Sequence, residues 1–301
     1  LKDLTKDYGN GRGIFDISLN IAEGEMVGFA GPNGSGKTTT IRHIMGFVKP
    51  TSGAAYVYGK EAWKHSSEFV RKIGYVPGEI AFPDFATGTA FLKSRAEYLG
   101  VRDMSYAEKL IERLQLDPSA SLKRMSKGMK QKTAIVAALI GDPEILLLDE
   151  PTTGLDPLMR SAFIDIIKEE HARGKTIFMS SHMFEELEAT CDRVALIANG
   201  RIADIVSLDE IRHPARREYK IEFKSPEDYN RFKGLGYEIV RDQPQYSQVT
   251  VSIGSNDLNN LFSDLTAFDI RFISEVKYNL DTYFRKRLNK NLEKETEEYV
   301  Q

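Results

Sequence analysis

The chain has few of the features that mark secreted or membrane-embedded proteins. It has one cysteine, Cys191, so no internal disulfide can form, and we interpret it as a small buried residue in a reducing compartment. Apolar runs such as residues 134–140 fall far short of the ~18 residues that span a bilayer. No signal peptide is visible, and the net charge of −3 gives no sign of a nucleic-acid partner.

Length and composition are those of a globular protein. The 301 residues allow one large domain or two modest ones, each with its own core. The hydrophobic content of 41% and the charged content of 28% are ordinary. Function must therefore be sought in motifs.

Residues 31–39, GPNGSGKTT, match the phosphate-loop pattern G-x-x-x-x-G-K-[ST]. The loop lies between a short apolar stretch, residues 26–30, and a segment with helical periodicity, which is the context that this motif requires. Glycines let backbone N–H groups turn inward, and the helix N-terminus favours anions. Lys37 would reach the β- and γ-phosphates, and the Thr38 hydroxyl would hold Mg²⁺. The predicted nucleotide-binding residues of the loop are Asn33, Gly34, Ser35, Gly36, Lys37, Thr38 and Thr39.

Polar side chains follow two predicted strands. Residues 145–150, ILLLDE, read as a buried parallel strand that ends in two carboxylates, where ligands sit in such sheets. Asp149 would hold Mg²⁺ through a water, and Glu150 would polarise the attacking water. Residues 176–180 form a second strand, and His182 just beyond it can reach the γ-phosphate.

A second anion site is predicted at residues 124–132, which precede a helix at 133–140. Ser126 suits an N-cap, and Gly128 permits close approach of a phosphate. One nucleotide cannot easily use both sites of one chain, because the second lies on a separate helical region. Two chains packed head to tail could share it.

The order of elements predicts an α/β core with additions. Further strands are expected at 15–21, 55–58, 73–76 and 194–198, and Asn199-Gly200 predicts a hairpin. Residues 79–141 read as a helical insertion. After residue 212 the order is β-α-β-β-α-β, the split pattern of a ferredoxin-like α+β domain, followed by a helix from Asn279 with a charged, solvated end. We therefore predict domains at 1–211 and 212–301.

Together these motifs resemble the nucleotide-binding subunit of ATP-binding cassette (ABC) transporters, over residues 1 to about 210. The resemblance rests on residues 31–39, MSKGM at 125–129, residues 145–150, Gly154-Leu155-Asp156 and His182. It implies a P-loop NTPase cassette that uses ATP and Mg²⁺. It also implies that Tyr8 stacks on adenine, Glu150 is the general base, His182 is the switch residue and Asp156 belongs to a loop that crosses the dimer interface. The loop at 73–77 would contact the membrane subunit. The signature presented to the partner chain would be Ser126, Lys127, Gly128 and Met129.

Two departures from the family pattern matter. The usual signature LSGGQ is replaced by MSKGM, so Lys127 adds a cation and Met129 removes an amide. The glutamine expected after Tyr75-Val76-Pro77 is replaced by Gly78. Either Glu79 or an extra water would then complete the Mg²⁺ shell.

These observations predict an ATPase that powers transport, leaning towards export, from the cytoplasmic face of the membrane. Its partners would be a separate transmembrane permease subunit and a second ATPase chain, identical or related, with no nucleic acid. The alternative is a soluble cassette ATPase acting on ribosomes or DNA, but such chains carry two cassettes or a long coiled coil. A GTPase is disfavoured because residues 289–292, NKNL, do not match Asn-Lys-x-Asp. The C-terminal domain could be regulatory, dimerising or stabilising, and we favour a structural or dimerising role.

Overall fold

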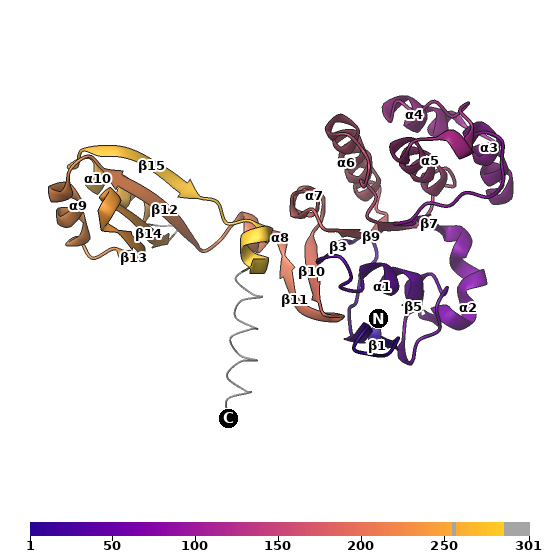
Figure 1. Ribbon diagram of the computed structural model, residues 1–301, viewed down its shortest axis with the longest axis horizontal. Helices are drawn as coiled ribbons and strands as arrows, with labels where there is room; N and C mark the ends of the chain where they lie inside the picture. The colour runs from indigo at the N-terminus through magenta and orange to yellow at the C-terminus, as the bar shows by residue number, and fades with distance from the viewer. Residues whose placement is uncertain (255–256, 286–301) are drawn as a thin grey trace. The chain divides into compact units, whose positions relative to one another are not determined.

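The computed structural model describes residues 1–254 and 257–285, which form two compact units divided between Leu208 and Asp209 (Figure 1). The sequence placed this division between residues 211 and 212. The first unit contains, in chain order, β1 (Lys2–Asp7), β2 (Gly13–Ile17), β3 (Met26–Ala30), α1 (Lys37–Ile44), β4 (Ser52–Ala54), β5 (Tyr56–Val57), β6 (Lys60–Glu61), α2 (Ala62–Phe69), β7 (Ile73–Val76), α3 (Gly88–Leu99), α4 (Ser105–Arg113), α5 (Lys127–Leu139), β8 (Ile145–Asp149), α6 (Pro157–Ala172), β9 (Thr176–Ser181), α7 (Phe184–Thr190), β10 (Arg193–Ala198) and β11 (Arg201–Ser207).

The central sheet has the strand order β11-β10-β3-β9-β8-β7. Strands β10, β3, β9, β8 and β7 are parallel, and β11 adds an antiparallel edge. Strand β3 is buried along its whole length between β9 and β10, which explains why it reads as a continuous apolar run. The predicted α/β fold is confirmed.

A smaller antiparallel sheet, β2-β1-β4, packs beside this core. Strand β1 escaped the sequence analysis because its sequence, KDLTKD, buries only Leu4. The predicted hairpin is present, since Ala198 pairs with Arg201 across a two-residue turn. Asn199 and Gly200 have φ values of 48° and 75°, as this turn type requires.

The helical insertion consists of α3, α4 and α5, with only an isolated bridge between Thr87 and Ser121. The predicted start of its last helix was wrong, because α5 begins at Lys127 rather than residue 133. Its first turns bury the polar Gln131 and Thr133 instead of apolar residues, so the apolar periodicity appears only later. In Figure 1, α1 is drawn below the β7–β9 part of the sheet and α5 above it.

Helix α8 (Leu208–Arg212) crosses the division, because Leu208 belongs to the first unit and the rest of the helix to the second. After α8, the second unit has the predicted β-α-β-β-α-β order. Its elements are β12 (Arg216–Phe223), α9 (Pro226–Lys233), β13 (Glu238–Gln243), β14 (Gln248–Gly254), α10 (Leu258–Leu265) and β15 (Ile270–Val276). The strands are ordered β13-β14-β12-β15, all antiparallel, around a core that includes Phe223 and Phe232. Ser225 caps α9 by accepting a hydrogen bond from the Asp228 N–H, at 3.1 Å. A further helix starts after Asn279, whose side chain accepts from the Thr282 N–H, and the predicted charged end from residue 286 lies outside the described residues.

Candidate active site

The phosphate loop joins β3 to α1 through a backbone that requires glycine. Gly36 has a φ of 111°, and a Cβ there would stand 2.4 Å from the Ile14 Cγ2 atom. Gly34 also has a positive φ, of 81°. No side chain caps the N-terminus of α1, so its first N–H groups are available to an anion.

Lys37 extends from this helix towards the end of β8. Its ammonium is buried, and it donates to the carbonyls of Gly31 at 2.7 Å and Pro32 at 3.2 Å. The same nitrogen lies 3.2 Å from Glu150 Oε1. A cation therefore lies between the loop that would hold the phosphates and the predicted general base.

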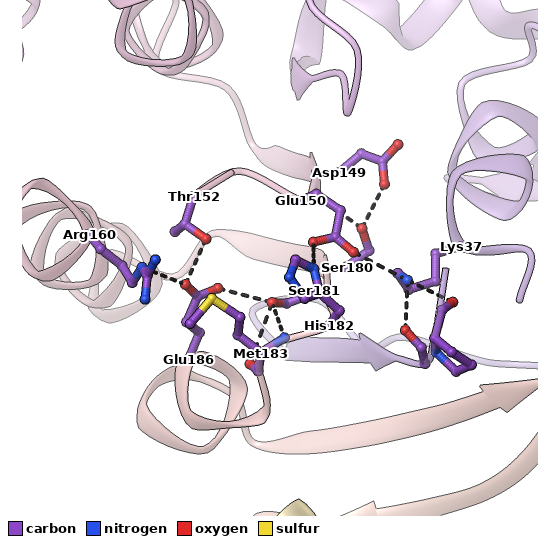
Figure 2. A network of polar contacts seen from close by, with 12 residues as sticks. Lys37, Asp149, Glu150, Thr152, Arg160, Ser180, Ser181, His182, Met183 and Glu186 are labelled. Atoms are coloured by element: carbon purple, nitrogen blue, oxygen red, sulfur yellow. Dashed lines mark hydrogen bonds and ion pairs between the residues drawn. The ribbon is translucent and has the colours of Figure 1, made fainter. Parts of the chain in front are cut away.

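Glu150 and His182 meet at the carboxyl ends of β8 and β9 (Figure 2). His182 Nδ1 is 2.5 Å from Glu150 Oε2. The turn at Glu150 has a φ of 50° and is held by Ser180, whose carbonyl and hydroxyl oxygens accept from the Glu150 N–H at 3.2 Å and 3.1 Å. Parallel strands thus bring together three residues, Lys37, Glu150 and His182, that are far apart in the sequence.

Asp149 offers an acceptor for a metal-bound water. It is fully buried, and its Oδ1 accepts from the Ser180 hydroxyl at 2.7 Å. Among the described residues, no hydrogen-bond donor contacts its Oδ2. A buried carboxylate oxygen without a donor is costly unless a ligand satisfies it. This donor set fits Mg²⁺, which keeps several waters and takes few protein ligands.

The role of Glu79 as a Mg²⁺ ligand stays a prediction. Glu79 is exposed, and none of the described contacts joins it to Asp149 or Thr38. The neighbouring Gly78 is the residue that approaches, because a Cβ on it would lie 2.9 Å from Asp149 Oδ2. No cluster of three or more His, Cys, Asp or Glu side chains in the described ranges could hold a metal ion. Waters and phosphate oxygens would have to supply the other ligands, beside the half-buried Thr38.

The N-terminus of α5 presents the predicted signature. The Ser126 hydroxyl accepts from the Met129 N–H at 3.2 Å, and both Ser126 and Lys127 are exposed. A Cβ on Gly128 would lie 2.8 Å from the Gly154 carbonyl oxygen, so the signature turn packs on the loop that follows Glu150.

Asp156 ends this loop and caps α6, where its Oδ1 accepts from the Met159 N–H at 2.9 Å. Tyr8 is 57% exposed on the β1–β2 turn. That turn continues into Gly13, whose carbonyl oxygen lies 3.6 Å from a Cβ built on Gly36, so the end of the turn reaches the phosphate loop.

Sequence reasoning missed the buried polar residues that support the site. Gln131 on α5 donates to the Pro151 carbonyl at 2.7 Å and so joins the signature helix to the Glu150 loop. Ser180 and Glu186 are also buried there. No local pattern marks such residues, because their partners come from distant segments.

A phosphate loop, an acidic strand end and a capped signature helix define an ATPase of the ATP-binding cassette class. The comparisons agree, since the "ABC transporter" family model matches residues 14–153. The bacitracin transport ATP-binding protein BcrA of Bacillus licheniformis is 32% identical, over 94% of this chain and 95% of its own. The Nod factor export ATP-binding protein I of Cupriavidus metallidurans is 34% identical, over 67% and 68%.

Solved structures give the same result. The ATP-binding subunit of an ABC transporter superposes with a TM-score of 0.63 and 32% identity, covering 70% of this chain and 90% of that one. The dimeric cassette MJ0796 bound to ADP and Pi gives a TM-score of 0.60 at 25% identity, covering 69% and 97%. The chain belongs to the ABC transporter ATP-binding proteins and is an ATPase subunit. Within the described residues, no helix is long and apolar enough to cross a membrane.

Proposed function

We propose that this chain, docked at the cytoplasmic face of a membrane, hydrolyses ATP to drive export through a separate transmembrane subunit. The observation that carries the proposal is the contact of Glu150 with both Lys37 and His182 at the end of β8. The export direction is supported by the printed name of the Nod factor export relative. Residues 1–211 would form the ATPase domain and residues 212–301 an accessory domain with a structural or dimerising role.

Each residue has a chemical task in this proposal. Lys37 binds the β- and γ-phosphates and offsets their charge, while Tyr8 stacks on adenine. Glu150 orients the attacking water and accepts its proton, and His182 holds Glu150 and contacts the γ-phosphate. Mg²⁺, held by Thr38 and through water by Asp149, would neutralise charge on the phosphates.

Closure of two chains completes each site. The N-terminus of α5, with the exposed Ser126 and Lys127, would contact the γ-phosphate held by a second chain. That chain is either a second copy or a related ATPase. Because hydrolysis removes the shared phosphate contact, the pair would open afterwards.

Glu150→Gln tests the assignment. Because glutamine keeps the shape but accepts no proton, we expect hydrolysis to fall by roughly 10²–10⁴-fold while ATP binding persists. Light scattering should show a dimer of the variant only with ATP and Mg²⁺. Glu144→Gln, at the exposed opposite end of β8, is the matched control and should hydrolyse ATP normally. Near-normal ATP turnover of Glu150→Gln would show that Glu150 is not the general base.

The direction of transport needs a separate test. Everted membrane vesicles that contain the transmembrane subunit should accumulate substrate on addition of ATP and this chain. Bacitracin, named in one relative, is a suitable first probe. ATP-driven loss of preloaded bacitracin from the same vesicles would indicate import instead.

A further inference from the structure

Glu186 on α7 is a buried carboxylate to which the proposed mechanism assigns no task (Figure 2). Only 2% of its surface is exposed. Its Oε1 accepts from the Thr152 hydroxyl at 2.6 Å, and its Oε2 accepts from the Ser181 hydroxyl at 3.0 Å. Arg160 Nε lies 3.3 Å from Oε1 and supplies a positive charge.

The partners of Glu186 come from the segments that carry the reactive residues. Thr152 lies two residues after Glu150, and Ser181 directly precedes His182. Ser181 Oγ also accepts from the Met183 N–H at 2.9 Å, so the backbone is bound on both sides of His182. Arg160 stands in the first turns of α6, the helix that Asp156 caps. One carboxylate therefore joins the loop after β8, the end of β9 and the start of α6.

The burial of the Glu186 carboxylate argues against a simple packing role for this residue. Burying a carboxylate is costly because it loses its hydration, and an apolar side chain would fill the same space without that cost. A carboxylate, however, can accept hydrogen bonds from several donors at once in a fixed geometry. Glu186 therefore fixes the segment that carries Glu150 relative to the segment that carries His182. The 2.5 Å contact between His182 and Glu150 joins these two segments.

We propose that Glu186 is a positioning residue that holds Glu150 and His182 in their reactive arrangement. The inference rests on the proposed roles of those two residues. Glu186 does not touch the phosphate loop, so it acts on the rate of hydrolysis and not on the capture of ATP.

The test compares Glu186→Gln with Glu185→Gln, its exposed neighbour on the same helical turn. We expect kcat to fall roughly 10- to 100-fold in Glu186→Gln, because small displacements of reacting groups have effects of that size. Affinity for a fluorescent ATP analogue and KM should stay close to those of the control, whereas the melting temperature should fall, because the substitution breaks a buried ion pair with Arg160; kcat is therefore compared per folded protein. A loss of kcat per folded protein that is matched by an equal loss of ATP affinity would show a merely structural role and overturn the proposal.

A milder variant keeps the test valid if Glu186→Gln folds poorly. Ser181→Ala removes one of the two hydroxyls and should lower kcat in the same direction, by less. When both changes are combined in a folded protein, the effects should be less than additive. Unchanged kcat in both single variants would refute the positioning role. If Glu150→Gln still blocks turnover in that case, only this inference fails and the proposed function stands.

Discussion

A buried ion pair between Glu170 and Lys175 should contribute much more to stability than the exposed pair beside it. Glu170 is 1% exposed and Lys175 6%, and Glu170 Oε2 lies 2.7 Å from the Lys175 ammonium. Glu170 Oε1 accepts from the Tyr106 hydroxyl at 2.6 Å and from Arg173 at 2.8 Å. Because Tyr106 belongs to α4 and Glu170 to α6, their hydrogen bond joins the helical insertion to α6.

The loss of stability in Glu170→Gln depends on how far Lys175 is left without a compensating charge. Breaking a buried pair costs about 3–5 kcal/mol when one charge stays uncompensated. Here Lys175 keeps a second partner, Asp142, at 2.5 Å, so we expect a loss of about 2–3 kcal/mol. The control is Glu169→Gln, because Glu169 pairs with Arg113 but is 60% exposed. Its loss should stay below about 1 kcal/mol.

Urea unfolding monitored by tryptophan fluorescence measures both variants. The single tryptophan, Trp63, belongs to α2 in the first unit, so its signal reports on the unit that contains the mutation. At equal slope, the difference in midpoints gives the free-energy difference. Equal losses in Glu170→Gln and Glu169→Gln would refute the reasoning.

The stabilisation by Glu170 should also depend on pH. Burial alone would raise its pKa, but Lys175, Tyr106 and Arg173 outweigh this and hold the pKa below its usual 4.5. A carboxyl whose pKa is lowered in the folded state stabilises the protein fully above that ordinary value. The advantage of the wild type over Glu170→Gln should therefore be complete at pH 7 and shrink as the pH falls below about 4.5. A difference that persisted at still lower pH would contradict the assignment to the ionised carboxylate.

Three further variants test the nucleotide site. Tyr8→Ala should weaken ATP binding by about 1–3 kcal/mol, the usual worth of a base stacked on an aromatic ring, whereas Tyr8→Phe should bind normally in equilibrium titrations. Gly36→Ala should abolish ATP binding in the same titration, since its Cβ would meet Ile14 at 2.4 Å, and a retained affinity would show that the loop can rearrange. Asp149→Asn should raise the Mg²⁺ concentration needed for half-maximal hydrolysis, and an unchanged Mg²⁺ requirement would exclude Asp149 from the metal site.

Local patterns were sufficient to predict the parts of the fold in which neighbouring residues determine the structure. The apolar run of β3, the glycines of the phosphate loop and the Asn199-Gly200 turn each carry their own signal, and each lies where it was predicted. The family and the ATPase activity followed from such motifs and are confirmed.

Features held by distant partners were not predictable. Strand β1 has too little buried surface to show a pattern, and the start of α5 is hidden by its buried Gln131. Glu186 looks like any glutamate of an acidic helix, and only the fold brings Thr152 and Ser181 to it. The close approach of the Gly78 backbone to Asp149 also depends on two distant segments, and no local pattern indicates it.

The place of β3 between β9 and β10 determines when, during synthesis, the nucleotide site can form. This strand and the loop after it leave the ribosome well before their neighbours β9 and β10. The loop itself is held by the Gly200 N–H, which donates to the Ser35 carbonyl at 3.1 Å. Translation from Ser35 to Gly200 takes on the order of 10–30 s at ordinary rates. During that interval the nascent chain carries the complete GPNGSGKTT sequence without the strands that hold the loop in shape. The chain should therefore become able to bind ATP only near the end of synthesis of the first unit.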